Sequence, residues 1–178
     1  MELELDLRAA DKIWTQIMVD KMSAEKRSAL MSRIRGKDTL PEMAVRKRLW
    51  REGFRYRLHP KGLAGRPDLV LPKWGAVVFV HGCFWHRHNG CSYFRLPKTR
   101  TAFWDAKLQR NRERDASALK TLIDAGWRLA VVWECALRRD ADHVGELLAT
   151  WLTMRDDSIE IEEAGSEVKD RPLIVSGR

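Results

Sequence analysis

The sequence predicts a single α/β domain built on a mixed β-sheet. Apolar, β-rich runs at residues 67–71, 75–80 and 127–133 are interspersed with segments of helical periodicity. Helices and strands that alternate along a chain pack as layers around one core. The length of 178 residues fits one such domain and suffices to bury a substantial core.

Two helix patterns precede the first of these runs. Residues 23–35 carry apolar side chains on one side and predict a short helix. The sequence Thr39-Leu-Pro-Glu42 predicts the start of a longer one, because Thr39 can cap it and Glu42 completes a capping box. Pro41 suits the first turn, and Gly53 is expected to end this helix.

The runs at 67–71 and 75–80 are separated by a short junction and predict an antiparallel hairpin. The numbers of facing residues then sum to roughly 147, which places Asp68 beside Phe79 and near His81. A carboxylate and an imidazole are therefore expected at one end of a buried sheet. The chain continues through an irregular segment at 82–101, a helix at 103–125, the strand at 127–133 and a final helix at 141–152.

The distribution of charge indicates a polyanionic partner. Lys and Arg number 33 against 25 Asp and Glu, a net charge of +8, and residues 26–66 alone carry 13 basic and three acidic side chains. Residues 156–170 hold seven acids and one lysine. This pattern is typical of a nucleic-acid footprint with a solvated end. We divide the chain into an N-terminal extension (1–19), a domain (20–153) and an acidic tail (154–178), and mobility is the expectation for both ends.

The composition excludes several classes of protein. With 44% hydrophobic and 33% charged residues the chain is neither disordered nor collagen-like, and three cysteines are too few for a disulfide scaffold. No uncharged apolar run approaches the roughly 18 residues of a membrane span. The acidic N-terminus also lacks a signal-peptide pattern. We expect a soluble cytoplasmic protein with no membrane partner.

The segment from His81 to Cys91 contains two thiols and three imidazoles within eleven residues. Cys83, His88 and Cys91 can close on one metal ion. Cys135 follows the last predicted strand and can return to the same place. Three cysteines and one histidine suit a saturated, tetrahedral structural zinc site. Inert buried thiols are the alternative, and the local density of ligands favours zinc.

A saturated zinc ion has no open position for water, so any chemistry needs other groups. His81 and His86 remain in this segment, and the hairpin delivers Asp68 near them. A carboxylate oxygen suits Mg²⁺, which keeps several waters and can hold a phosphate. Taken singly, Asp68 is most simply a strand-edge aspartate and His81 a core histidine. Together with the basic half of the chain they predict metal-assisted phosphodiester hydrolysis.

Four stretches of the sequence resemble the very-short-patch repair (Vsr) endonucleases of bacteria. They are Gly65-Arg-Pro-Asp68, Val78-Phe-Val-His-Gly-Cys-Phe-Trp-His86, Thr99-Arg-Thr-Ala-Phe-Trp104 and Val132-Trp-Glu-Cys135. The resemblance covers residues 20–153 and implies a restriction-endonuclease-like (PD-(D/E)XK) α/β fold with a structural zinc site. It also implies Mg²⁺-dependent nicking of duplex DNA beside the T of a T:G mismatch, the product of 5-methylcytosine deamination.

The resemblance implies roles for individual residues of the cleavage site. Asp68 corresponds to the aspartate that binds catalytic Mg²⁺, and the backbone carbonyl of Val80 corresponds to a second ligand. Threonine is frequent in the family at that position, so Val80 retains the carbonyl and loses the hydroxyl. His81 and His86 correspond to the two histidines that serve hydrolysis.

Two acids and the zinc ligands also have counterparts. Glu42 matches a glutamate near the active site, with the capping box as its structural alternative. Asp115 matches a residue that orients a histidine, with a solvated helix face as the alternative. The zinc ligands are Cys83, His88, Cys91 and Cys135, with one additional residue between His88 and Cys91 that a glycine-containing loop can absorb.

An enzyme that recognises one mismatched pair needs apolar wedges, because a T:G pair unstacks more easily than a correct pair. By the resemblance, Phe84, Trp85 and Trp104 form a wedge from the major groove. Met31, otherwise a core methionine, enters from the minor-groove side. The basic residues expected to bind phosphates are Lys26, Arg27, Arg33, Arg35 and Lys37. We expect a monomer, with other mismatch-repair proteins as candidate partners.

Two other functions remain open from the sequence. One is a restriction-type nuclease that cuts intact duplex without mismatch preference. The other is a non-catalytic, zinc-stabilised DNA-binding module, whose binding would survive loss of the Asp68 carboxylate.

Overall fold

The computed structural model describes residues 36–154, 158–165 and 167–173. Its centre is a six-stranded mixed sheet in the order β1-β2-β3-β4-β5-β6. The strands are β1 (Arg57–Leu58), β2 (Leu69–Leu71), β3 (Ala76–His81), β4 (Arg128–Trp133), β5 (Ser158–Ala164) and β6 (Glu167–Pro172). Strand β4 pairs in parallel with β3 and β5, while the remaining pairs are antiparallel. The predicted α/β class and mixed sheet are therefore confirmed.

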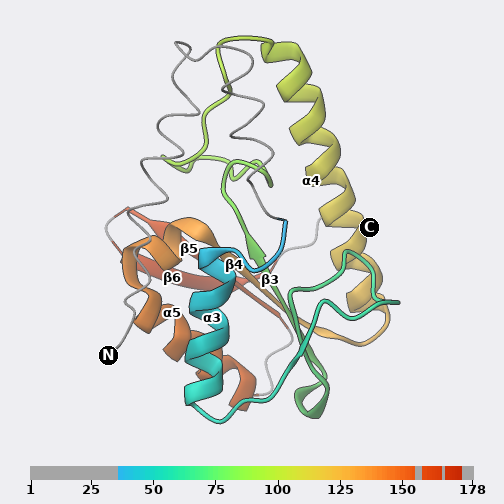
Figure 1. Cartoon of the computed structure of the whole chain (residues 1–178), viewed down its shortest axis with the longest axis vertical. Helices are drawn as coiled ribbons and strands as arrows, with labels where there is room; N and C mark the ends of the chain where they lie inside the picture. The colour runs from blue at the N-terminus through green and yellow to red at the C-terminus, as the bar shows by residue number, and fades with distance from the viewer. Residues whose placement is uncertain (1–35, 155–157, 166, 174–178) are drawn as a thin grey trace.

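Helices cover both faces of the sheet in the part of the chain that the structure describes. They are α3 (Leu40–Arg51), α4 (Thr101–Asp124) and α5 (Glu134–Thr153). Helices α3 and α5 lie together on one face, and α4 lies on the other (Figure 1). Side chains of each strand alternate between two cores: Val78 and Val132 face α3 and α5, whereas Val77 and Val131 face α4.

Helix α3 begins where the capping box predicts. The N–H of Glu42 donates to the Thr39 hydroxyl oxygen at 3.4 Å, and Pro41 lies in the first turn. The helix ends two residues before Gly53, which adopts a left-handed φ of +86°.

Helix α5 begins at Glu134, before the predicted start at residue 141. Asp140 is non-helical, with φ −157° and ψ 92°, and its carboxylate accepts the N–H of His143 at 2.8 Å. Asp140 therefore ends a first short helical segment and caps the second, which is the one predicted. The first segment carries Cys135 directly after β4.

The acidic tail differs from the expectation. Strands β5 (Ser158–Ala164) and β6 (Glu167–Pro172) pair into the sheet, so the folded domain extends past residue 153. Ile159 and Ile161 are buried in the core that contains α5, and they alternate with the partly exposed Glu160 and Glu162. The alternation of apolar residues places one face of β5 against the core. The charged residues lie on the other face of the strand and do not prevent it from forming.

The predicted helix at 23–35 and the extension at 1–19 lie outside the described residues. None of the helices in the described ranges combines the length and apolar character that crossing a bilayer requires.

Candidate active site and metal centre

The hairpin register is confirmed, and it determines the position of Asp68. Leu69 faces Val78, and the Asp68 N–H donates to the Val78 carbonyl at 3.1 Å. The Asp68 carboxylate turns toward β3, where its Oδ2 accepts the N–H of Val80 at 2.7 Å. Strand pairing thus brings this carboxylate to the end of β3, directly before His81.

The turn that precedes Asp68 requires glycine at position 65. Gly65 has a φ of +68°, and a Cβ there would lie 2.8 Å from the Cβ of Ala118 and 3.2 Å from the Phe79 ring. The missing side chain lets this turn pack closely on α4. The same helix carries Asp115.

The Asp68 carboxyl is unusually hard to ionise in the absence of a cation. Burial raises the pKa of Asp68 from 3.8 to about 7, even though the Val80 N–H lowers it. Charges on Glu42, His86 and Arg46 also act on this carboxyl, which shows that these side chains are close to it. A divalent cation could take the place of the proton, with Asp68 and the Val80 carbonyl as hard oxygen ligands.

The two predicted histidines lie together at the end of β3, His81 as its last residue and His86 in the segment that follows. The rings of His81 and His86 stack with their centroids 3.9 Å apart and their planes 2° from parallel. His86 Nδ1 lies 2.6 Å from the Oδ2 of Asp115. His81 is buried, and burial, together with the neighbouring His86 and His88, holds the pKa of His81 well below its usual value. A neutral imidazole therefore packs against a second, half-buried imidazole that a carboxylate orients.

Asp68 does not join these residues in one compact set of ligands. The candidate ligand atoms of His81, His86 and Asp115 lie within 4.8 Å of one another, and Asp68 is not in this group. The site therefore has two neighbouring parts: a carboxylate at the strand end and an imidazole pair with its orienting acid.

The Glu42 side chain takes part both in the start of α3 and in a buried ion pair. Its Oε1 accepts the Thr39 hydroxyl at 3.0 Å, and its Oε2 accepts the N–H of Asp38, the residue before the N-cap, at 3.0 Å. The side chain therefore closes the start of α3 in a variant of the predicted capping box. The same Oε2 accepts the Arg46 guanidinium at 2.9 Å. Glu42 and Arg46 are both buried, each 4% exposed, and so form an enclosed ion pair one helical turn apart.

Arg46 and His59, neither of which was predicted from the sequence, connect Glu42 to Asp68. Arg46 also contacts Asp38, and its Nη2 lies 2.9 Å from His59 Nε2. His59 Nδ1 lies 3.7 Å from Asp68 Oδ1. The four-residue spacing of Glu42 and Arg46 could have indicated the ion pair. Nothing local marks His59, which the pairing of β1 with β2 brings to Asp68.

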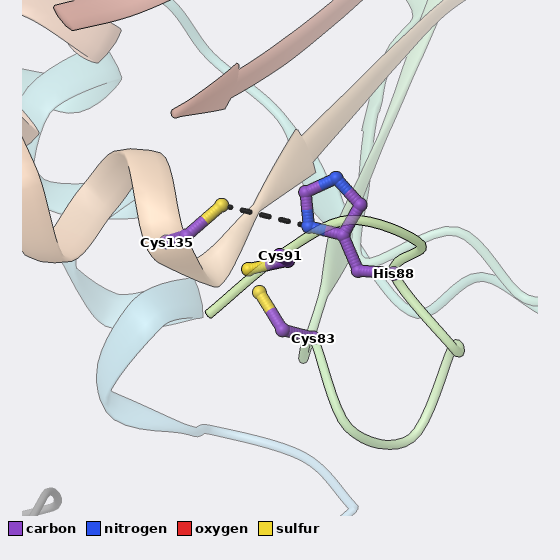
Figure 2. Close-up of side chains that lie close together, drawn as sticks. All are labelled: Cys83, His88, Cys91 and Cys135. Carbon is purple, nitrogen blue, oxygen red and sulfur yellow. Dashed lines mark hydrogen bonds between the residues drawn. The ribbon is translucent and has the colours of Figure 1, made fainter. Parts of the chain in front are cut away.

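The three cysteines and His88 converge on one point, as predicted. Their sulfur atoms and one imidazole nitrogen lie within 4.8 Å of one another, and the side chains point inward from the segment after β3 and from the start of α5 (Figure 2). His88 Nδ1 is 3.6 Å from Cys135 Sγ. Cys135, 44 positions beyond Cys91 in the sequence, is therefore part of the cluster. This donor set fits a closed tetrahedral zinc site.

The cluster favours one thiolate. Hydrogen bonds from Cys83 and His88 lower the pKa of Cys135 to about 4, whereas the same contact raises the pKa of Cys83. Burial raises the pKa of Cys91 to about 11. Burial also lowers the pKa of His88, but its hydrogen bonds with Cys135 and Glu162 raise it overall. Three thiols packed this closely need a cation to ionise together.

The predicted aromatic wedge is an ordered cluster with unequal exposure. Phe84 is buried, 5% exposed, and its ring centroid lies 5.1 Å from that of Trp85 and 5.6 Å from that of Trp104. Trp85 and Trp104 are partly exposed, and the Lys107 ammonium lies 5.5 Å and 5.2 Å from their ring centroids. Phe84 thus supports the two tryptophans from beneath, and they form the accessible part of the cluster.

One of the five predicted phosphate-binding residues lies in the described part of the chain. Lys37 is exposed, three residues before the first residue of α3. The other basic residues and the methionine lie outside the described residues: Lys26, Arg27, Arg33, Arg35 and Met31.

Comparison with known proteins gives consistent matches. A family model described as DNA mismatch endonuclease Vsr matches residues 19–92. The type II nicking enzyme V.XorIIP of Xanthomonas oryzae pv. oryzae is 50% identical over 120 residues, which cover 67% of this chain and 88% of that protein. The type II nicking enzyme V.NmeAIP of Neisseria meningitidis is 45% identical over 124 residues, covering 70% and 88% respectively. The DNA mismatch endonuclease Vsr of Escherichia coli is 38% identical over 152 residues, covering 83% and 97%.

Proposed function

Because the chain belongs to the Vsr family of DNA mismatch endonucleases, we propose that it nicks one strand of duplex DNA beside the T of a T:G mismatch. The observation that carries this proposal is the carboxylate-bound imidazole of His86, 2.6 Å from Asp115 and close enough to Asp68 to influence its pKa. An oriented base next to an acidic metal ligand is the arrangement that phosphodiester hydrolysis needs.

His86 acts as the general base in this proposal. In the neutral imidazole whose Nδ1–H is donated to Asp115, Nε2 is the nitrogen that takes a proton from the attacking water. His81 is held neutral by burial, and its ring stacks on His86 at 3.9 Å. His81 therefore fixes the plane of the base without adding a competing charge.

Asp68 and the backbone carbonyl of Val80 would hold the catalytic Mg²⁺. Once bound there, Mg²⁺ supplies charge stabilisation at the phosphate and makes a bound water more acidic. Because the pKa of Asp68 is about 7, roughly half of the protein already carries the carboxylate form near pH 7, and a bound cation would favour that form further. Glu42 holds the entry of α3 against Arg46 and contributes through that network.

Cys83, His88, Cys91 and Cys135 would hold a structural Zn²⁺. This centre ties the segment after β3 to the start of α5, so it keeps His81 and His86 in place. Its four ligands are all protein side chains, which separates it from the hydrolytic step.

Mismatch preference is assigned to the exposed aromatic surface. Trp85 follows Phe84 in the segment between His81 and His86, and Asn111 Nδ2 donates to the Trp85 carbonyl at 3.1 Å. Insertion of Trp85 and Trp104 into the base stack favours the pair that costs least to open. Lys107, over both rings, can bind a nearby phosphate.

Single-turnover nicking of short T:G and T:A duplexes in Mg²⁺ tests the proposal. A difference of a few kcal/mol in unstacking corresponds to a preference for T:G of about 10²-fold. Equal nicking rates on the two duplexes would instead indicate a nuclease without mismatch preference. Binding of both duplexes without any nicking would indicate the non-catalytic DNA-binding module.

A further inference from the structure

The acidic hairpin of β5 and β6 reaches the Cys3His cluster. Glu162 on β5 places its Oε2 2.7 Å from Nε2 of His88. His88 is 6% exposed and the Glu162 side chain 19%, so this contact is partly buried. The other ring nitrogen, Nδ1, faces Cys135 Sγ at 3.6 Å. The two nitrogens of His88 therefore have different tasks: one faces the thiols and the other faces a carboxylate.

A second contact from the same strand involves a thiol. The backbone N–H of Glu163 donates to Cys135 Sγ at 3.5 Å. Strand β5 thus contacts two of the four candidate ligands, one through a side chain and one through its backbone. Arg171 on β6 lies 3.4 Å from the Oε1 of Glu162, the carboxylate oxygen that does not contact His88.

The face of the His88 ring packs on Trp133, the last residue of β4, and β5 in turn holds the Trp133 indole. The His88 ring stacks on Trp133 with the centroids 3.9 Å apart and the planes 6° from parallel. The Trp133 Nε1–H donates to Glu160 Oε1 at 2.7 Å. Trp133 also packs edge-on against His81 at 5.3 Å, which connects this arrangement to the imidazole pair.

We infer that Glu162 is a positioning residue for the metal ligand His88 and that the β5–β6 hairpin supports the metal centre. The inference rests on the proposed zinc site. A carboxylate that accepts the Nε2–H fixes the tautomer in which Nδ1 carries the free lone pair, aims that lone pair at the thiols and makes it more basic. Removal of such a partner typically weakens metal binding by about 10–100-fold.

Zinc binding by the full-length protein tests this role without reference to nicking. Zinc content is measured by atomic absorption, and affinity by competition with a chromophoric chelator. Glu162→Gln should raise the apparent Kd for zinc by about 10–100-fold. Glu162→Asp keeps a carboxylate and should lose less. Glu163→Gln is the matched control, because it removes the same charge from the next residue and keeps the backbone N–H that reaches Cys135.

An apparent Kd for Glu162→Gln within about two-fold of both the wild-type protein and Glu163→Gln would overturn the inference. If Glu162→Gln fails to fold in dilute zinc but folds when zinc is raised, the inference is supported. If it fails at every zinc concentration while Glu163→Gln folds, Glu162 serves the fold and not the ligand. A wild-type protein that binds no zinc would overturn the centre and the role of Glu162 together. T:G nicking is not a readout here, so loss of the mismatch preference alone would not change these outcomes.

Discussion

Asp68→Asn should stabilise the Mg²⁺-free protein, and increasingly so as the pH rises. The change removes the negative charge and keeps the size of the side chain and an oxygen that can accept the Val80 N–H. Asp68 is only 18% exposed and has a pKa of about 7 in the folded protein, against 3.8 for an unperturbed carboxyl. Folding therefore disfavours its ionised form.

The sign follows from which state holds the proton. Below pH 4 both the folded and the unfolded chain are protonated at Asp68, so the group does not disfavour folding. Between about pH 4 and pH 7 the unfolded chain loses the proton and the folded chain keeps it, so the free energy of unfolding falls as the pH rises. The pKa difference of about 3 corresponds to about 4 kcal/mol, of which about 3 kcal/mol falls between pH 5 and pH 8.

Urea unfolding of the wild-type protein and Asp68→Asn at pH 5 and pH 8, without added Mg²⁺, measures this difference. Comparison at each pH cancels the contributions of groups that the two proteins share. The advantage of Asp68→Asn should grow by about 3 kcal/mol from pH 5 to pH 8. Added Mg²⁺ should reduce it, because the cation stabilises only the protein that has the carboxylate. A difference between the two proteins that stays constant with pH would refute the reasoning.

Three further predictions concern the other parts of the site. Asp115→Asn should reduce the single-turnover nicking rate by about 10²–10⁴-fold with unchanged DNA affinity, because the base loses its fixed tautomer. Asp124→Asn is its control, since it removes a carboxylate from an exposed ion pair of the same helix; equal rates for Asp115→Asn and the wild type would exclude the role. Trp85→Ala should reduce the T:G over T:A preference more than it reduces binding of matched duplex, measured by nicking rates and fluorescence anisotropy; an unchanged preference would contradict the wedge. Cys91→Ala should lower both zinc content and melting temperature, and full zinc content at an unchanged melting temperature would exclude Cys91 as a ligand.

The best-predicted parts of the site depend on local chemistry. The register of the β2–β3 hairpin follows from a short junction between two apolar runs, so the relative positions of Asp68 and His81 follow from the sequence alone. The same holds for the capping box of Thr39 and Glu42. Cys135 could be assigned because every cysteine is accounted for by one ligand set.

The parts that were not predicted from the sequence depend on which strands lie side by side in the sheet. His59 meets Asp68 only because β1 lies beside β2, and Glu162 meets His88 only because β5 lies beside β4. The acidic segment did contain a usable pattern, because Ile159 and Ile161 alternate with glutamates as in a half-buried strand. Its high charge favoured a solvated tail, and that preference was wrong for the residues of β5 and β6.

The assignment of strand cleavage to the carboxylate at the end of the β2–β3 hairpin is tested most directly by one titration. Single-turnover nicking of a T:G duplex is followed over a range of Mg²⁺ concentrations with the wild-type protein and with Asp68→Asn. The wild-type rate should rise with Mg²⁺ to a plateau, while Asp68→Asn binds the duplex and leaves it intact at every concentration. Nicking by Asp68→Asn at the wild-type rate and with the same Mg²⁺ dependence would contradict the account.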